Sequence, residues 1–444
     1  MTINSKPNTL PKLWKKALII LLLIVGLQIP LAIIESLITE RNASKISAEQ
    51  DIAGSSGHAQ TIYGPILNIP IKQQSENREI TYFLFPDSLK VVGTTEIEKR
   101  YRGIFQVPTY VAKLHFEGQF SDTALVEAGF TPESIKWDGV TFSVPLVDPH
   151  TIREAAPLHW NEKGLEFKPK ATSPFSNTGI HAKLSAGGFT PGNSHKFSFD
   201  ITVSGTSSLS FIPLSNQTDV QLTSPWKDPS FFGQYPPTTK EVTAAGFKAS
   251  WQVSQLGRDV NQLANNIGDL PNFSSMSFGV VFITPVDIYR MSDRAVKYAN
   301  LVILLTFITY FLFETLGGMR LHEMQYLMVG AALILFYLLL LSLSEHLPFS
   351  SAYLCGALLA IGLITGYSIS ILRSGMGSAL VGVLLGVQYG FFYILLQEQD
   401  YSLLFGSLGL TFILGTLMYV TRKVDWFSLG TSLKPTSEQL DVVQ

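Results

Sequence analysis

Six long apolar runs constrain this chain more than any other feature of its sequence, because a helix that crosses a bilayer needs about 20 mostly apolar residues. The first run covers residues 17–38, and five more follow one another closely near the C-terminus: 297–316, 325–344, 351–372, 377–397 and 401–421. Only 15% of the residues are charged, against about 25% in ordinary soluble proteins. The sequence therefore predicts an integral membrane protein with six helical spans.

The first run resembles a secretory signal peptide in one respect, because Lys12, Lys15 and Lys16 precede it. However, the run is long, and no pair of small residues stands before a plausible cleavage site. Residues 39–57 read as a polar helix that continues the run outward. We therefore expect an uncleaved membrane anchor at 17–38 rather than a signal peptide.

Basic residues are distributed unevenly among the short segments that flank the runs. They occur in the tail 1–16, in the loops after the second and fourth runs, and in the tail 422–444, as Lys6, Lys12, Lys15, Lys16, Arg320, Arg373, Arg422 and Lys423. The alternate loops, SEHLPFS and QEQDY, contain none. Because short cytoplasmic loops are enriched in Lys and Arg, both termini are predicted to be cytoplasmic and residues 39–296 to lie on the opposite side.

The long segment 39–296 alternates apolar with polar residues, as in TYVAKLHFEGQF at 109–120, and this period of two is typical of half-buried strands. Turn-forming stretches such as FPDS and TPGNS separate the strands. We therefore expect a large all-β domain, mixed but mainly antiparallel and sandwich-like. Its size favours two packed lobes over one large sandwich, and both arrangements stay open.

Charge and motifs exclude several functions for this domain. Residues 40–294 contain 22 basic and 25 acidic residues, so the domain has no strong positive field for nucleic acid. No His-x-Glu-x-x-His, Gly-x-Ser-x-Gly or Walker motif occurs, and Cys355 is the chain's one cysteine. No catalytic, cofactor-binding or metal-binding residues are predicted.

The ionisable residues near the membrane are the best candidates for a functional site. A charge at the centre of a bilayer costs at least about 2.5–3.5 kcal/mol on insertion scales, so such residues tend to be functional. Glu314 lies near the inner end of the second run, where it can pair with Arg320 or accept hydrogen bonds from amides at the start of the third. Glu345 and His346 close the third run. Structural anchoring is the favoured interpretation, and a proton or ligand role is the alternative.

Ser344, Glu345 and His346 are also residue types that hydrolases use together. Adjacent residues on a helix point about 100° apart, whereas a catalytic triad needs its members within hydrogen-bond reach of one another. We therefore expect these residues to mark the end of a span. The junction 284–307 adds two candidates for coupling between the domain and the spans. Ser292 or Asp293 is predicted to cap a helix, and Arg294 is predicted to lie at the level of the lipid headgroups.

The chain resembles the CreD family of bacterial inner membrane proteins. The resemblance rests on long stretches that include GPILNIPI at 64–71, the segment 222–251, the segment 283–314, LHEMQYLMVGAALILFYLLLLSLSEHLPFSSAY at 321–353 and TRKVDWFSL at 421–429. It implies an inner-membrane location, a periplasmic domain, and a part in cell-envelope integrity and the envelope-stress response. It implies no catalytic activity, cofactor or substrate.

Three functions are compatible with these observations. The leading one is a non-enzymatic membrane protein whose periplasmic β-domain binds or senses an envelope protein or cell-wall component. The alternatives are a transporter or channel that uses the C-terminal spans, and, less favoured, a membrane-embedded hydrolase. The partners expected are the lipid bilayer and an envelope component, and the small-residue spacing of GMGSALVGVLLG at 375–386 also suits packing between protomers of a homo-oligomer.

Overall fold

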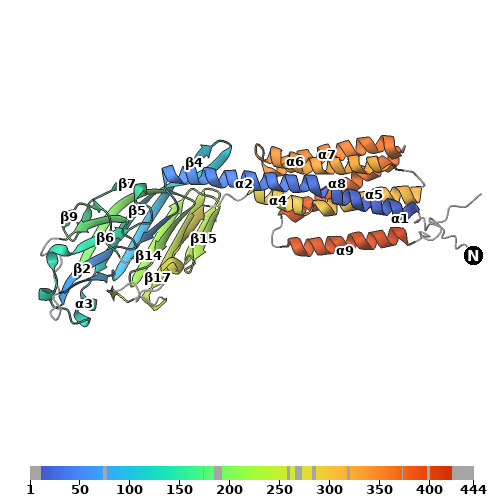
Figure 1. The fold of residues 1–444 in the computed structure, drawn as a ribbon. Coiled ribbons are helices and arrows are strands. Elements are labelled where there is room, and N and C mark those ends of the chain that lie inside the picture. Colours follow the sequence, from blue (N-terminus) through green and yellow to red (C-terminus); the bar gives the residue numbers. More distant parts are fainter. Residues whose placement is uncertain are drawn as a thin grey trace, which may run out of the picture. The chain divides into compact units, whose positions relative to one another are not determined.

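The structure is a computed structural model that describes residues 12–73, 78–173, 175–184, 193–257, 261–265, 273–282, 287–317, 321–372, 374–397 and 401–422. The chain forms two compact units (Figure 1). A helical unit comprises Met1–Ser44 and Val286–Gln444, and a β unit comprises Lys45–Pro285. The boundary between the units falls within helix α2 (Gln28–Ser56).

The helical unit contains the apolar runs. Its helices are α1 (Lys12–Gly26), the first part of α2, α4 (Ile288–Lys297), α5 (Ala299–Gly317), α6 (Glu323–Ser344), α7 (Phe349–Leu372), α8 (Gly375–Gln397) and α9 (Ser402–Thr421). In the described part of the chain, five helices are long and apolar enough to cross a membrane, or six if α4 and α5, bent by 42°, form one span. The prediction of a multi-span membrane protein with an N-terminal span is therefore confirmed.

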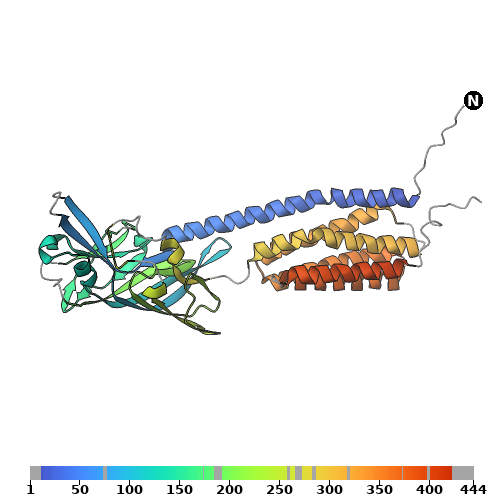
Figure 2. The same cartoon turned by 90° about the horizontal axis from the view of Figure 1, so that it is seen from below.

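The N-terminal span is longer than its apolar run. Figure 2 shows α1 and α2, in blue, running almost in line. The break between them lies at Leu27, and Pro30 explains it, because proline has no N–H to donate to the carbonyl of Gly26. Beyond the apolar run, α2 continues to Ser56, which confirms the expected polar extension.

The N-terminal span packs against the bundle along one face. Leu27, Leu31, Ile34 and Ile38 recur every three or four residues and are all buried, which is the spacing of one side of a helix. Gly330 of α6 permits the close approach, because a Cβ there would lie 2.5 Å from Cδ1 of Leu27. Helix α9, in contrast, has no buried residue among those described.

In the described residues, the β unit forms three sheets. Their strands are β1 (Gln60–Tyr63), β2 (Ile66–Gln73), β3 (Arg78–Leu84), β4 (Ser88–Arg102), β5 (Phe105–Phe120), β6 (Thr141–Pro145), β7 (Ile152–Ala155), β8 (Leu158–Trp160), β9 (Lys163–Leu165), β10 (Lys168–Pro169), β11 (Gly179–Lys183), β12 (His195–Thr206), β13 (Ser208–Ile212), β14 (Gln217–Ser224), β15 (Pro229–Gly233), β16 (Thr239–Thr243), β17 (Gly246–Ser254), β18 (Leu263–Ala264) and β19 (Phe278–Phe282). Among the described residues, one short α-helix, α3 (Thr123–Glu127), lies between β5 and β6.

The sheets are mixed, as expected, and mainly antiparallel. Their orders are β1-β13-β19-β15, then β10-β11-β6-β2-β3-β18, and then β16-β17-β14-β4-β5-β12-β8-β9 with β7 also paired to β12. Among the described strands, β1 with β13 and β14 with β4 pair in parallel. Strand β12 alternates buried and less buried side chains along most of its length, which is the period of two that the sequence displays.

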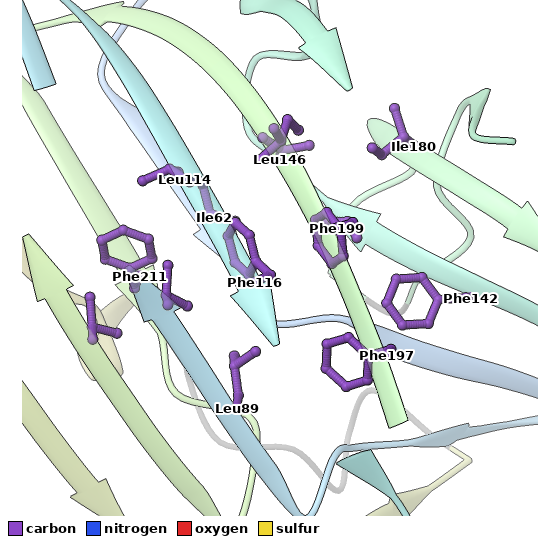
Figure 3. Close-up of a cluster of buried hydrophobic side chains, with 14 of the residues drawn as sticks. Ile62, Leu89, Leu114, Phe116, Phe142, Leu146, Ile180, Phe197, Phe199 and Phe211 are labelled. Carbon is purple, nitrogen blue, oxygen red and sulfur yellow. The ribbon is translucent and has the colours of Figure 1, made fainter. Parts of the chain in front are cut away.

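One large cluster of buried side chains runs through the three sheets and includes Phe116, Phe142, Phe197 and Phe199 (Figure 3). The rings of Phe116 and Phe199 stack with centroids 4.7 Å apart. Because this core is continuous and the β unit is compact as a whole, the described strands fit the alternative of one large unit better than two separate lobes.

Candidate functional site

The first candidate site, which we call the Glu314 cluster, consists of Lys16, Glu314, Leu321 and Tyr326. The Lys16 ammonium forms an ion pair with the carboxylate of Glu314 and also donates to the carbonyl of Leu321. Glu314 accepts two further hydrogen bonds, from the Leu321 amide at 3.3 Å and from the Tyr326 hydroxyl at 3.2 Å. The side chains of Lys16 and Glu314 are only 18% and 14% exposed. Among the described residues, the carboxylate is thus held by one ammonium group, one backbone amide and one hydroxyl.

The second candidate site, the Glu345 cluster, consists of Arg41, Tyr289 and Glu345. Arg41 of α2 places its Nε atom 3.4 Å from the Glu345 carboxylate. The hydroxyl of Tyr289, at the start of α4, donates to the same carboxylate oxygen at 3.1 Å. The Glu345 side chain is 10% exposed, whereas that of Arg41 is about half exposed. Here too, a carboxylate of the bundle holds one cation and one tyrosine.

Together the two clusters fasten the N-terminal span at its two ends. Each combines a carboxylate from the C-terminal helices with a tyrosine from those helices and a cation from the N-terminal span. Lys16 and Arg41 are about 37 Å apart at the helical rise of 1.5 Å per residue. Between them, the Gln28 amide donates to Oδ1 of Asn300 at 2.6 Å. The N-terminal span is thus held at three levels, with the apolar face described above between the ends.

Sequence reasoning found the carboxylates but missed their partners. The expected hydrogen bond from Glu314 to an amide at the start of the third span is present, at Leu321. Its main cation is Lys16, which lies 298 residues away in the sequence. Arg320, the other expected partner, lies outside the described residues. The only available signal was that Lys16 and Arg41 stand at the two ends of the first apolar run.

The Ser344–Glu345–His346 triplet is not arranged as a triad. The Ser344 hydroxyl donates to the carbonyl of Leu341 in its own helix, at 2.9 Å. Glu345 is engaged by Arg41 and Tyr289, as described above, and His346 is exposed. The three side chains therefore have separate environments, and the geometry is that of a helix end.

The helix cap at the junction is a different residue from the one expected. The prediction that Ser292 or Asp293 caps a helix is wrong, because Asp287 is the N-cap of α4 and accepts from two amides, at 3.1 and 3.3 Å. Asp293 lies inside α4 and pairs with Lys297 one turn later, at 2.6 Å. Arg294 donates to the carbonyls of Leu395 and Leu396 at 3.0 and 3.1 Å. It therefore caps the C-terminal end of α8, where unpaired carbonyls favour a cation.

An aromatic cavity lies in the bundle near Arg294. It has a volume of about 10 Å³ and is lined by residues of α4, α5, α6, α7 and α8, including Tyr298, Tyr337, Tyr353 and Tyr389. The buried hydroxyl of Tyr389 makes no hydrogen bond to any described residue. Such a volume suits about one water molecule rather than a substrate. Within the described residues, no group of three or more His, Cys, Asp or Glu is placed to hold a metal ion.

Comparisons with known proteins agree on the family. A family model described as "Inner membrane protein CreD" matches residues 12–427. The chain is 32% identical over 424 residues to "Inner membrane protein CreD" of Escherichia coli (strain K12), covering 93% of this chain and 94% of that protein.

Similarity to solved structures is slight. A two-domain M1 zinc metallopeptidase mutant bound to L-arginine matches with a TM-score of 0.22 and 9% identity, over 45% of this chain and 42% of the other. An M1 zinc metallopeptidase from Deinococcus radiodurans matches with a TM-score of 0.22 and 10% identity, over 48% and 43%. These scores carry no functional argument.

Proposed function

The chain belongs to the CreD family of inner membrane proteins, and on that premise we propose that it supports cell-envelope integrity without catalysing a reaction. In this proposal the β unit lies in the periplasm and binds an envelope protein or a cell-wall component. The helical unit holds the β unit at the membrane, with both termini in the cytoplasm.

The orientation is supported by the distribution of charge. In the sequence, Lys16 precedes the first span and Arg320 stands between the second and third spans, whereas the loop that contains Glu345 and His346 has no Lys or Arg. Because short cytoplasmic loops are enriched in Lys and Arg, the β unit, which lies in the sequence between the first and second spans, belongs on the periplasmic side in this proposal.

One observation carries the proposal of a binding role. The chain inserts a unit of three sheets with its own extensive core between its first span and the rest of the bundle. Ser344 and Glu345, which the hydrolase alternative would use, are instead engaged at a helix end, and His346 is exposed. A large, well-packed unit with balanced surface charge is suited to presenting a recognition surface outside the bilayer.

Topology and function are tested separately. With Cys355→Ser as background, a membrane-impermeant maleimide should label Leu256→Cys, at a position that is 99% exposed, in cells with a permeabilised outer membrane. It should label Ser5→Cys only after the inner membrane is opened. Labelling of the two positions in the reverse order would refute the orientation.

A complementation assay then tests the role of the β unit. A chain in which a flexible linker replaces residues 57–282 should insert in the membrane but fail to restore envelope resistance in a deletion strain. A chain with Glu314→Gln and Glu345→Gln should restore it if accumulation is normal. Full activity without the β unit would refute the proposal.

The transporter alternative is favoured by one observation, namely that both clusters place a mostly buried carboxylate near an end of the bundle. If the neutral variants accumulate normally but abolish function, while the chain without the β unit retains it, the transporter alternative is the better account.

A further inference from the structure

The β4–β5 hairpin extends well beyond the sheet that contains it. Strand β14 pairs with β4 only as far as Thr94, and β12 pairs with β5 only from Thr109 onward. The pairing of β4 with β5 continues to Arg102 and Phe105. The eight residues of β4 after Thr94 span about 26 Å at 3.3 Å per residue, and Figure 1 shows the hairpin projecting at the label β4.

A two-stranded ribbon is marginally stable alone, so it needs other support. Helix α2 lies beside it, because the Arg102 guanidinium is 3.3 Å from the carboxylate of Asp51. The body of the β unit meets the chain just after the end of α2, at Gly57, where a Cβ would lie 2.2 Å from Cγ2 of Thr151. The ribbon therefore runs back beside the C-terminal part of α2, as far as Asp51.

The tip of the ribbon, residues 98–104, combines exposed apolar and basic side chains. Tyr101 is 68% and Ile104 43% exposed. Three basic residues stand beside them, Lys99, Arg100 and Arg102, and their one acidic neighbour in the tip is Glu98, 3.7 Å from Arg100. Both ion pairs of the tip are exposed and so contribute little stability. Tyrosine with Lys or Arg is the combination that proteins place at a membrane–water interface.

A second loop that combines an aromatic with a basic residue lies at this end of the β unit. Strand β14 runs parallel to β4, so the loop that follows it, with Trp226 and Lys227, leaves the same end of the sheet as the ribbon. The Trp226 ring lies 6.5 Å from that of Phe282, the last residue of β19, after which the chain passes to α4. Both connections to the spans therefore belong to the end that carries these two loops.

We propose that this end of the β unit contacts the anionic lipid headgroups of the membrane that the chain spans, with the β4–β5 tip as the main contact. Tyr101 and Ile104 enter the interfacial layer, and Lys99 and Arg100 bind phosphate groups. A lipid surface is preferred to a protein partner because the apolar residues at the tip are few and flanked by cations, whereas a protein interface buries a larger apolar core. The proposal does not depend on which side of the membrane the β unit occupies.

The test uses the full chain in nanodiscs, with Cys355→Ser as background and a fluorophore on Ile104→Cys. The matched control carries the fluorophore on Leu256→Cys, which follows β17 at the opposite end of the sheet. Nanodiscs of phosphatidylcholine, with and without phosphatidylglycerol, contain lipids with a nitroxide quencher on the headgroup. We expect quenching at position 104 to be several-fold stronger than at 256, and to increase when phosphatidylglycerol is present.

A charge variant separates electrostatic attraction from simple proximity. Arg100→Gln should reduce quenching at position 104, whereas Lys163→Gln, an exposed lysine of β9 at the far end of the sheet, should not. Equal quenching at positions 104 and 256 would overturn the proposed contact. Quenching at 104 that is insensitive to phosphatidylglycerol and to Arg100→Gln would overturn the assignment of anionic lipid as the partner.

Discussion

The ion pair between Lys16 and Glu314 permits a quantitative test of how the N-terminal span is held. Removing one partner of a buried ion pair usually costs about 3–5 kcal/mol, because the remaining charge stays away from water without compensation. The side chains are 18% and 14% exposed, so some water reaches them. We therefore expect the lower end of this range, about 3 kcal/mol, for Lys16→Met or Glu314→Gln alone.

The double variant is expected to differ little from either single variant. With both charges absent, no uncompensated charge remains. The Gln carbonyl still accepts from the Leu321 amide, and its NH2 group, in place of the second carboxylate oxygen, can donate to the Tyr326 hydroxyl oxygen. The coupling free energy between the two positions should therefore be about 2–3 kcal/mol. The free energy of unfolding is measured in mixed micelles by circular dichroism as the mole fraction of dodecyl sulfate rises.

A matched control is the exposed pair Lys90–Glu117, with an N–O distance of 2.7 Å and side chains 58% and 43% exposed. Its coupling should be much smaller, because water screens both charges. If the Lys16 and Glu314 variants are additive within about 0.5 kcal/mol, the two residues act independently. The two-ended attachment described above would then be refuted at this end.

Three further substitutions have defined outcomes. Gly330→Leu should destabilise the helical unit by about 1–3 kcal/mol through overpacking against Leu27, whereas Gly362→Leu, at a position with open space, should be tolerated in the same micelle assay. Burial raises the pKa of the Tyr110 hydroxyl above its usual value near 10. The protonated hydroxyl therefore stabilises the fold fully below pH 10, and this stabilisation is lost as the pH rises further. Tyr110→Phe should lower the free energy of unfolding at pH 7 by about 1 kcal/mol, through the lost 2.7 Å bond to a backbone carbonyl, and should weaken the alkaline decline measured by urea titration. Arg294→Gln should lower the melting temperature, because the C-terminal end of α8 loses its cap. Arg294→Lys should lower it less, since lysine keeps the charge but lacks the planar fork that reaches two carbonyls. A melting temperature of Arg294→Lys equal to that of the unchanged protein would indicate that charge alone matters.

Local patterns were sufficient to predict the architecture. Apolar length identifies the spans because the bilayer thickness fixes it, and the period of two in β12 predicts a half-buried strand without knowledge of its neighbours. The polar extension of the first span to Ser56 was predictable for the same reason, since helical composition continues without a break.

Long-range pairings were not predictable in this way. The sequence shows that Glu314 needs a compensating donor, and the nearest cation in the sequence, Arg320, was the obvious candidate. The partner Lys16 comes from a helix packed beside α5 and α6, and only tertiary packing brings it there. The N-cap of α4 was misplaced for a related reason. Ser292, Asp293 and Asp287 are all suitable cap residues, so composition alone does not choose among them.

The attachment of the N-terminal span to late helices has a consequence for biosynthesis. Lys16 is synthesised 298 residues before Glu314, which is a delay of roughly 15–60 s at 5–20 residues per second. During that interval the first span sits in the membrane while the whole β unit is translated and folds. The helix must therefore be stable as a lone insertion, and its charged ends acquire their partners only after the whole β unit has been synthesised.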